Sequence, residues 1–139
     1  MNSRLSARPS SAVAAEKISK TILIAEDDTT SRQLTRTVLQ EAGFAVIESV
    51  DGEDAINKFR ENCSSVSLVV LDVIMPKKNG KEVYDVIIAL KPEVKVLFMS
   101  GYTASIIYKK GVLEPGLNFL AKPVSPRIVL KRIREILDS

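Results

Sequence analysis

The chain has 139 residues, of which 45% are hydrophobic and 27% are charged, so it can form one globular domain with a hydrophobic core. No apolar run is long enough to span a membrane, and the N-terminus lacks the apolar segment of a secretory signal. The single cysteine, Cys63, cannot form an internal disulfide, which favours a reducing, cytoplasmic location. The absence of histidine excludes histidine-based catalytic sets, histidine-ligated metals and a phosphohistidine within these 139 residues.

The net charge of +3 arises at the N-terminus, because the basic and acidic residues after position 20 balance. The few dispersed cations of residues 1–20 are a weak signal for nucleic acid or anionic lipid, so we expect neither partner. We interpret residues 1–19 as a disordered lead-in or linker, with at most a short helix over residues 12–18.

Five short apolar runs alternate with five segments of helical character. We expect strands at residues 21–25, 44–50, 66–71, 94–99 and 117–121. We expect helices over residues 29–42, from 51 onward, over 81–90 and 103–110, and from 126 onward. This alternation predicts an α/β fold, a doubly wound five-stranded parallel sheet with helices on both faces.

Helix starts and buried faces follow from local signals. Asp28, Asp51, Asn79 and Ser125 are expected N-caps, and Gly43 is expected just after the first helix. The apolar spacing predicts four buried faces, made of Leu34, Val38 and Ala42; Ala55, Ile56 and Phe59; Val83, Ile87 and Leu90; and Val129, Ile133 and Ile136.

Polar residues gather where the predicted strands end. Glu26 and Asp27 follow the first strand, Asp72 the third, Ser100 the fourth and Lys122 the fifth. The carboxyl ends of parallel strands lie along one edge of a sheet, so these side chains should share a pocket. A carboxylate directly after a buried strand is costly to desolvate unless a cation or a reaction uses it.

The chemistry of this set favours phosphoryl transfer. Three crowded carboxylates repel one another, and Mg²⁺ with oxygen ligands in an open cleft relieves that repulsion. The metal and Lys122 can then neutralise a phosphoryl group while Ser100 donates a hydrogen bond and one carboxylate attacks.

These residues resemble the receiver domain of two-component response regulators, over essentially Lys20 to Asp138. The resemblance implies a flavodoxin-like strand order of 2-1-3-4-5 and a receiver domain over residues 20–139. The matching stretches are Ile22-Leu23-Ile24-Ala25-Glu26-Asp27-Asp28, Asp72-x-x-Met75-Pro76-x-x-x-Gly80, Met99-Ser100-Gly101 and Phe119-Leu120-Ala121-Lys122-Pro123.

The resemblance implies that Asp72 is the phosphoacceptor. Mg²⁺ would be held by Asp27, by Glu26, by Asp72 itself and by the backbone carbonyl of Ile74. Lys122 would pair with the phosphoryl group. The domain would catalyse its own phosphorylation and dephosphorylation without turning over a metabolite.

The resemblance also implies a switch. Ser100 would swing towards the phosphoryl group, and Phe119 would change rotamer with it. Both would alter the surface formed by the fourth helix, the fifth strand and the fifth helix, through which a homodimer is also conceivable. A cis bond is expected at Lys122-Pro123. Gly101 has less bulk than the family's usual residue, which predicts a short-lived phosphoryl group.

The expected partner is a histidine kinase or a histidine phosphotransfer protein. The stretch Phe98 to Thr103 and the segment Gly111 to Gly116 resemble the C-terminal receivers of hybrid sensor histidine kinases. The chain ends soon after the last helix, so we expect no output domain after it. We favour the hybrid-kinase setting, and a stand-alone single-domain response regulator is the alternative.

Two other classes of function are weaker. A haloacid-dehalogenase-type phosphohydrolase needs a second carboxylate two residues after the nucleophile, where this chain has Ile74. A flavodoxin-like module for a flavin or nucleotide needs a phosphate-cradling loop after the first strand. This chain has Glu26, Asp27 and Asp28 at that place, and they repel phosphate when no metal is bound.

Overall fold

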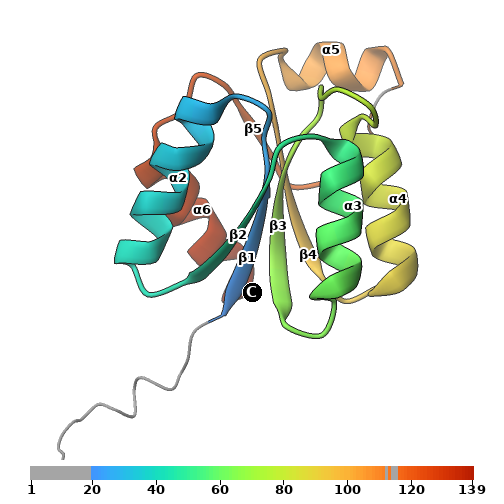
Figure 1. The fold of residues 1–139 in the computed structure, drawn as a ribbon. Coiled ribbons are helices and arrows are strands. Elements are labelled where there is room, and N and C mark those ends of the chain that lie inside the picture. Colours follow the sequence, from blue (N-terminus) through green and yellow to red (C-terminus); the bar gives the residue numbers. More distant parts are fainter. Residues whose placement is uncertain (1–19, 112, 114–115) are drawn as a thin grey trace, which may run out of the picture.

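A computed structural model describes residues 20–111, 113 and 116–139. They form a five-stranded parallel sheet in the order β2-β1-β3-β4-β5, with helices on both faces (Figure 1). The strands are β1 (Thr21–Ala25), β2 (Ala45–Ser49), β3 (Val66–Asp72), β4 (Lys95–Ser100) and β5 (Phe119–Ala121). The helices are α2 (Thr29–Glu41), α3 (Gly52–Glu61), α4 (Gly80–Leu90), α5 (Ala104–Lys109) and α6 (Pro126–Leu137). The predicted fold class and flavodoxin-like order are confirmed.

Two expectations concern residues outside the described part of the chain. The lead-in of residues 1–19, with its short helix over 12–18, lies entirely outside it, and the segment 111–116 lies partly outside it. Among the described helices, none combines the length and the apolar character needed to cross a bilayer.

The hydrophobic core has two halves, one on each face of the sheet. Helices α2 and α6 cover one face, and α3 and α4 cover the other (Figure 1). Ile22 and Ile24 of β1 pack on the α2 and α6 side, whereas Leu23 and Ala25 pack on the α3 and α4 side. Because both faces are covered, the inner strands are apolar at nearly every position.

The helices start where local capping signals place them. Asp28, Asp51, Asn79 and Ser125 each accept a hydrogen bond from the backbone N–H three residues later. Glu82 completes a capping box with Asn79. Each cap is worth about 1 kcal/mol. The caps mark where the loops that leave the carboxyl edge of the sheet end, and the polar residues described next lie at this edge.

The buried face of α2 differs from the predicted one. Leu34 is 54% exposed, and the buried positions are Arg32, Thr35 and Leu39. The prediction was wrong for Leu34, whereas Val38 and Ala42 are partly buried and pack against the core as expected. Arg32 takes a buried position because its guanidinium is neutralised inside the protein by Glu48. Apolar spacing alone does not identify a buried cation.

Two other apolar predictions fail at the ends of elements. Leu90, the last residue of α4, is 44% exposed rather than buried. Val50 lies beyond the end of β2 and is exposed. Strand β5 starts at Phe119 rather than at residue 117. The ends of an element have fewer neighbours to pack against, so the apolar character of a single residue decides little there.

Candidate functional site

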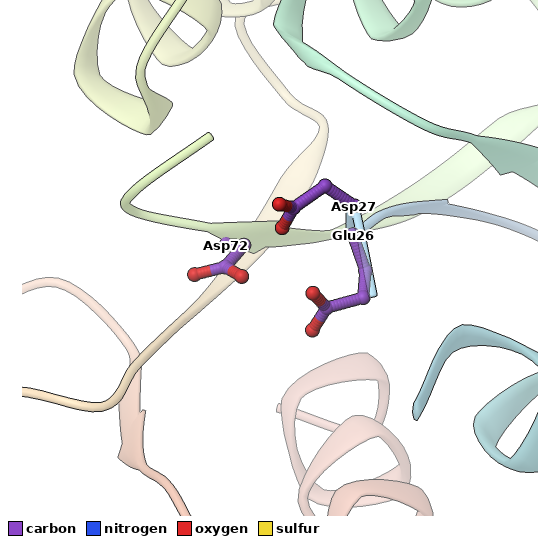
Figure 2. A group of neighbouring side chains, drawn as sticks. All are labelled: Glu26, Asp27 and Asp72. Atoms are coloured by element: carbon purple, nitrogen blue, oxygen red, sulfur yellow. The ribbon is translucent and has the colours of Figure 1, made fainter. Parts of the chain in front are cut away.

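Three carboxylates meet at the carboxyl edge of the sheet. Glu26 and Asp27 directly follow β1, and Asp72 ends β3, the strand paired with β1. One carboxylate oxygen from each lies within 4.8 Å of the others, and Figure 2 shows the three side chains converging. Glu26 and Asp72 are buried, whereas Asp27 is exposed. The cluster is therefore enclosed on one side and open to ligands on the other.

Lys122 joins the two buried acids. Its Nζ donates to Oε1 of Glu26 at 2.6 Å and to Oδ2 of Asp72 at 3.0 Å. The second oxygen of each carboxylate accepts a backbone N–H, from Asp28 at 3.0 Å and from Ile74 at 3.4 Å. Residues that end or follow β1, β3 and β5 thus form one hydrogen-bonded set, as the sequence predicted for this edge.

Burial changes the proton affinity of this set. Loss of water raises the pKa of the Asp72 carboxyl to about 6, and the charge of Glu26 adds to the rise while Lys122 opposes it. Burial alone lowers the pKa of Lys122, but its hydrogen bonds to Glu26 and Asp72 outweigh that effect and raise it. One ammonium does not fully offset two buried carboxylates. Hard oxygen ligands with an open side suit Mg²⁺, which keeps several waters.

Ser100 reaches the same edge from the neighbouring strand. It ends β4 and is fully buried, and its Oγ accepts the N–H of Tyr102 at 3.0 Å. Its backbone carbonyl accepts the N–H of Lys122 at 2.7 Å, which ties β4 to the residue that carries the ammonium. The peptide bond between Lys122 and Pro123 is cis. Gly101 is exposed, and a Cβ added there would meet no atom within 4 Å.

Phe119 lies on the edge strand β5 and is half-buried. Its ring centroid is 6.4 Å from that of Tyr108 on α5, with the planes tilted by 55°. Such tilted aromatic pairs are favourable beyond their buried area. Tyr108 was not among the predicted site residues, and its place in a short helix of weak apolar pattern gave no signal for it.

The loop after Asp72 is held in place by two glycines. Gly80 donates its N–H to the Val73 carbonyl at 2.8 Å, and a Cβ on it would lie 2.7 Å from the carbonyl oxygen of Asp72. Gly52 opens α3, and a Cβ on it would overlap the Lys78 carbonyl oxygen. Close backbone contact therefore fixes the loop that carries Ile74, and sequence reasoning missed Gly52 in this role.

Lys77 also secures this loop, at some conformational cost. Its φ of 71° lies in the left-handed region, which lysine seldom adopts. Its Nζ lies 3.8 Å from Oδ2 of Asp51 and 3.6 Å from Oε1 of Glu53, both at the start of α3. The Lys77 side chain is 60% exposed and both N–O distances are long, so each contact contributes well under about 1 kcal/mol.

A cleft of about 450 Å³ opens beside the acids. Glu26 and Lys122 line it, together with apolar residues of the sheet and of α2, including the exposed Leu34. Arg32 also lines it, and this buried residue was missed by sequence reasoning. Arg32 lies three residues before the buried Thr35 and seven before the buried Leu39. This helical spacing was the signal in the sequence that could have placed Arg32 on the buried face of α2.

Comparison with known proteins agrees with this geometry. The family model described as "Response regulator receiver domain" matches residues 22–134. The sensor kinase CckA of Brucella abortus (strain 2308) is 29% identical over 86% of this chain, which spans 13% of that kinase. The chemotaxis protein CheY of Treponema pallidum (strain Nichols) is 28% identical over 84% of this chain, which spans 81% of it.

Solved structures give the same assignment. The receiver domain of the hybrid histidine kinase CckA is 30% identical, with a TM-score of 0.72 over 84% of this chain and 98% of that one. CheY of Borrelia burgdorferi, crystallised in a complex with CheX, BeF₃ and Mg²⁺, is 28% identical, with a TM-score of 0.71 over 84% of this chain and 88% of that one.

Proteins of this kind bind Mg²⁺ at an acidic pocket and interact with histidine kinases or phosphotransfer proteins. The parallel sheet, the acids at its carboxyl edge and the family match over residues 22–134 lead to one assignment. The chain belongs to the response regulator receiver domain family and is a receiver domain of two-component signalling.

Proposed function

We propose that Asp72 is the phosphoacceptor of this receiver domain. The observation that carries the proposal is the pair of hydrogen bonds from Lys122 to Asp72 and Glu26. They hold the Asp72 carboxylate beside that of Glu26, in the cluster that also contains the exposed Asp27. A buried carboxylate beside a fixed ammonium is suited to nucleophilic attack on a phosphoryl group.

The transfer forms one bond and breaks one. An Asp72 carboxylate oxygen attacks the phosphorus of a phosphohistidine, the phosphorus–nitrogen bond breaks, and the imidazole nitrogen leaves with the electron pair. Lys122 moves from the free carboxylate to an oxygen of the phosphoryl group, which carries more charge. With no histidine in these 139 residues, the donor histidine lies outside them.

Asp27, Glu26, Asp72 and the carbonyl of Ile74 are the proposed ligands of Mg²⁺. Mg²⁺ held by these ligands would neutralise the charge that spreads over the phosphoryl oxygens during transfer. Asp27 suits direct ligation because it is exposed, whereas Glu26 already has both oxygens hydrogen-bonded and suits ligation through water.

Ser100 and Phe119 are the proposed switch residues. The Ser100 hydroxyl accepts the Tyr102 N–H and still has a hydrogen to donate, so a rotation that directs it towards a phosphoryl group acts on the start of the segment that leads to α5. Phe119 contacts Tyr108 of α5, so a new Phe119 rotamer alters the packing of that helix. The proposed output surface is therefore that of α5, β5 and α6, which are the fourth helix, the fifth strand and the fifth helix expected from the sequence. Homodimerisation is one use of this surface.

We also propose that the native protein is a hybrid sensor histidine kinase, because the CckA receiver shares 30% of its residues with this chain. A stand-alone response regulator is the other setting, represented by CheY. The free Cys63 supports a cytoplasmic location for the domain.

Labelling with a small acyl phosphate tests the phosphoacceptor. With Mg²⁺ present, the wild-type chain should gain one phosphoryl group by intact mass, and the Asp72→Asn variant should gain none. Asp85→Asn removes an exposed carboxylate of α4 and should label normally. Undiminished labelling of Asp72→Asn would overturn the assignment.

A further inference from the structure

Arg32 is a buried cation that contacts the backbone of the acidic site. Its side chain is 9% exposed, on the face of α2 turned to the sheet. Its Nε donates to Oε1 of Glu48 at 2.9 Å, and its Nη1 donates to the carbonyl oxygen of Glu26 at 2.9 Å. One guanidinium therefore links α2, β2 and the residue that follows β1.

Glu48 holds this guanidinium in place. It lies on β2 opposite Ile24 of β1, and its second oxygen accepts a hydrogen bond from Nη1 of Arg36 at 2.6 Å. Burial acts to raise the pKa of Glu48, but the hydrogen bonds from Arg36 and Arg32 outweigh it and lower the pKa. Glu48 is therefore ionised at neutral pH and compensates two cations one helical turn apart.

The carbonyl that Arg32 contacts belongs to the peptide unit between Glu26 and Asp27. A peptide unit is planar, so a hydrogen bond to its oxygen restrains the backbone of both residues. Asp27 is exposed, and the position of its carboxylate depends largely on its own backbone. The carboxylate of Glu26 is held separately, by Lys122 and by the N–H of Asp28.

We propose that Arg32 is a positioning residue for the divalent-cation site and acts through the Glu26–Asp27 peptide unit. It touches neither the cation nor the phosphoryl group. It restricts Asp27 to the orientation in which its carboxylate lies near those of Glu26 and Asp72. This inference rests on the Mg²⁺ site of the proposed function.

The geometry requires arginine rather than any cation. The guanidinium is a rigid fork that presents Nε to Glu48 and Nη1 to Glu26 at the same time. The ammonium of a lysine is a single point on a shorter side chain and cannot take both positions. Arg32→Lys therefore preserves the charge and most of the packing but loses the link to the peptide unit.

Arg36 provides a matched control. It is on the same helix, one turn later, and pairs with the same glutamate, but it does not contact Glu26. If Arg32 only connects α2 to β2 through Glu48, replacing either arginine should change Mg²⁺ affinity equally. A positioning role predicts an effect on Mg²⁺ affinity for Arg32 alone.

The test measures Mg²⁺ binding to the unphosphorylated full chain by isothermal titration calorimetry, with the melting temperature recorded for each variant. Partners that orient metal ligands usually change affinity by 10–100-fold, so Arg32→Met should weaken Mg²⁺ binding by about tenfold. Arg32→Lys, which keeps the positive charge, should weaken it about threefold or more. Arg36→Met should stay within about twofold of wild type while lowering the melting temperature.

The outcomes separate this inference from the one on which it rests. If Arg32→Lys binds Mg²⁺ as tightly as wild type, or if the Arg32 and Arg36 variants weaken binding equally, the positioning role is wrong. If the wild-type chain itself binds no Mg²⁺, the proposed metal site fails. If Arg32→Met does not fold, the Mg²⁺ affinities of Arg32→Lys and Arg36→Lys are compared instead, and only Arg32→Lys should bind more weakly than wild type.

Discussion

The ammonium of Lys122 lies 3.0 Å from a carboxylate oxygen of Asp72, a residue 50 positions earlier in the chain. The contact spans from the last strand of the sheet to the central one, across β4. It exists because both residues leave parallel strands at the same edge. The charges of this pair affect both the proposed phosphorylation of Asp72 and the stability of the fold.

Replacing Lys122 by methionine should slow phosphorylation of Asp72. Without the ammonium, Glu26 and Asp72 face each other uncompensated, and the pKa of Asp72 should rise beyond about 6. The phosphoryl group also loses its cationic partner, and loss of one such group costs about a hundredfold in rate. The initial rate of labelling by an acyl phosphate at pH 7.5 measures this. Lys131→Met, on the exposed side of α6, should leave the rate unchanged; an unaltered rate in Lys122→Met contradicts the role of Lys122.

Replacing Asp72 by asparagine should stabilise the fold at neutral pH. The folded state raises the pKa of this carboxyl from 3.8 to about 6, so between these values the folded protein binds more protons than the unfolded chain. The wild type therefore loses stability as pH rises through 6. A rise in pKa from 3.8 to about 6 corresponds to about 3 kcal/mol, and solvent screening at this partly open site reduces the expected gain for Asp72→Asn at pH 7.5 to on the order of 1–2 kcal/mol. Lys122 retains its partner Glu26 in the variant.

Urea unfolding without divalent cations measures the free-energy difference between Asp72→Asn and wild type. It should shrink as pH falls from 7.5 towards 4, because the wild-type carboxyl becomes neutral. A difference that stays constant over this range would show that burial does not perturb Asp72. Asp85→Asn, which removes an exposed carboxylate of α4, is the control variant.

Replacing Gly52 by alanine should disturb the loop after Asp72. The new Cβ would overlap the Lys78 carbonyl, and the N–H of Gly52 would lose its 3.3 Å hydrogen bond to the Pro76 carbonyl. Overpacking of this kind costs about 1–3 kcal/mol. Mg²⁺ affinity should also fall, because the loop carries the Ile74 carbonyl. Urea unfolding and calorimetry measure the two effects. Glu61→Ala, at the exposed end of α3, is the control; a Gly52→Ala protein with wild-type stability contradicts the close contact.

Replacing Gly101 by alanine should prolong the lifetime of the phosphoryl group. The added methyl meets no atom within 4 Å, so the fold can accept it. Its bulk beside the site should hinder water, and a barrier higher by about 0.5–1 kcal/mol slows hydrolysis a few-fold. The decay of phosphorylated protein after removal of the donor measures the rate. A lifetime of many hours in the wild type would contradict the short lifetime predicted from Gly101.

The sequence determined the features that depend on near neighbours. The apolar runs identified the strands, and the N-caps Asp28, Asp51, Asn79 and Ser125 identified where helices start. The polar residues at strand ends defined the acidic pocket. Each of these signals lies within a few residues of the feature that it specifies.

The tertiary structure decided what depends on distant neighbours. Leu34 is exposed and Arg32 is buried because Glu48, on another strand, supplies the charge that a buried guanidinium needs. The role of Gly52 likewise depends on the Lys78 carbonyl, which only folding brings close. Burial, electrostatic compensation and close packing are properties of groups in space, and a pattern along the chain does not contain them.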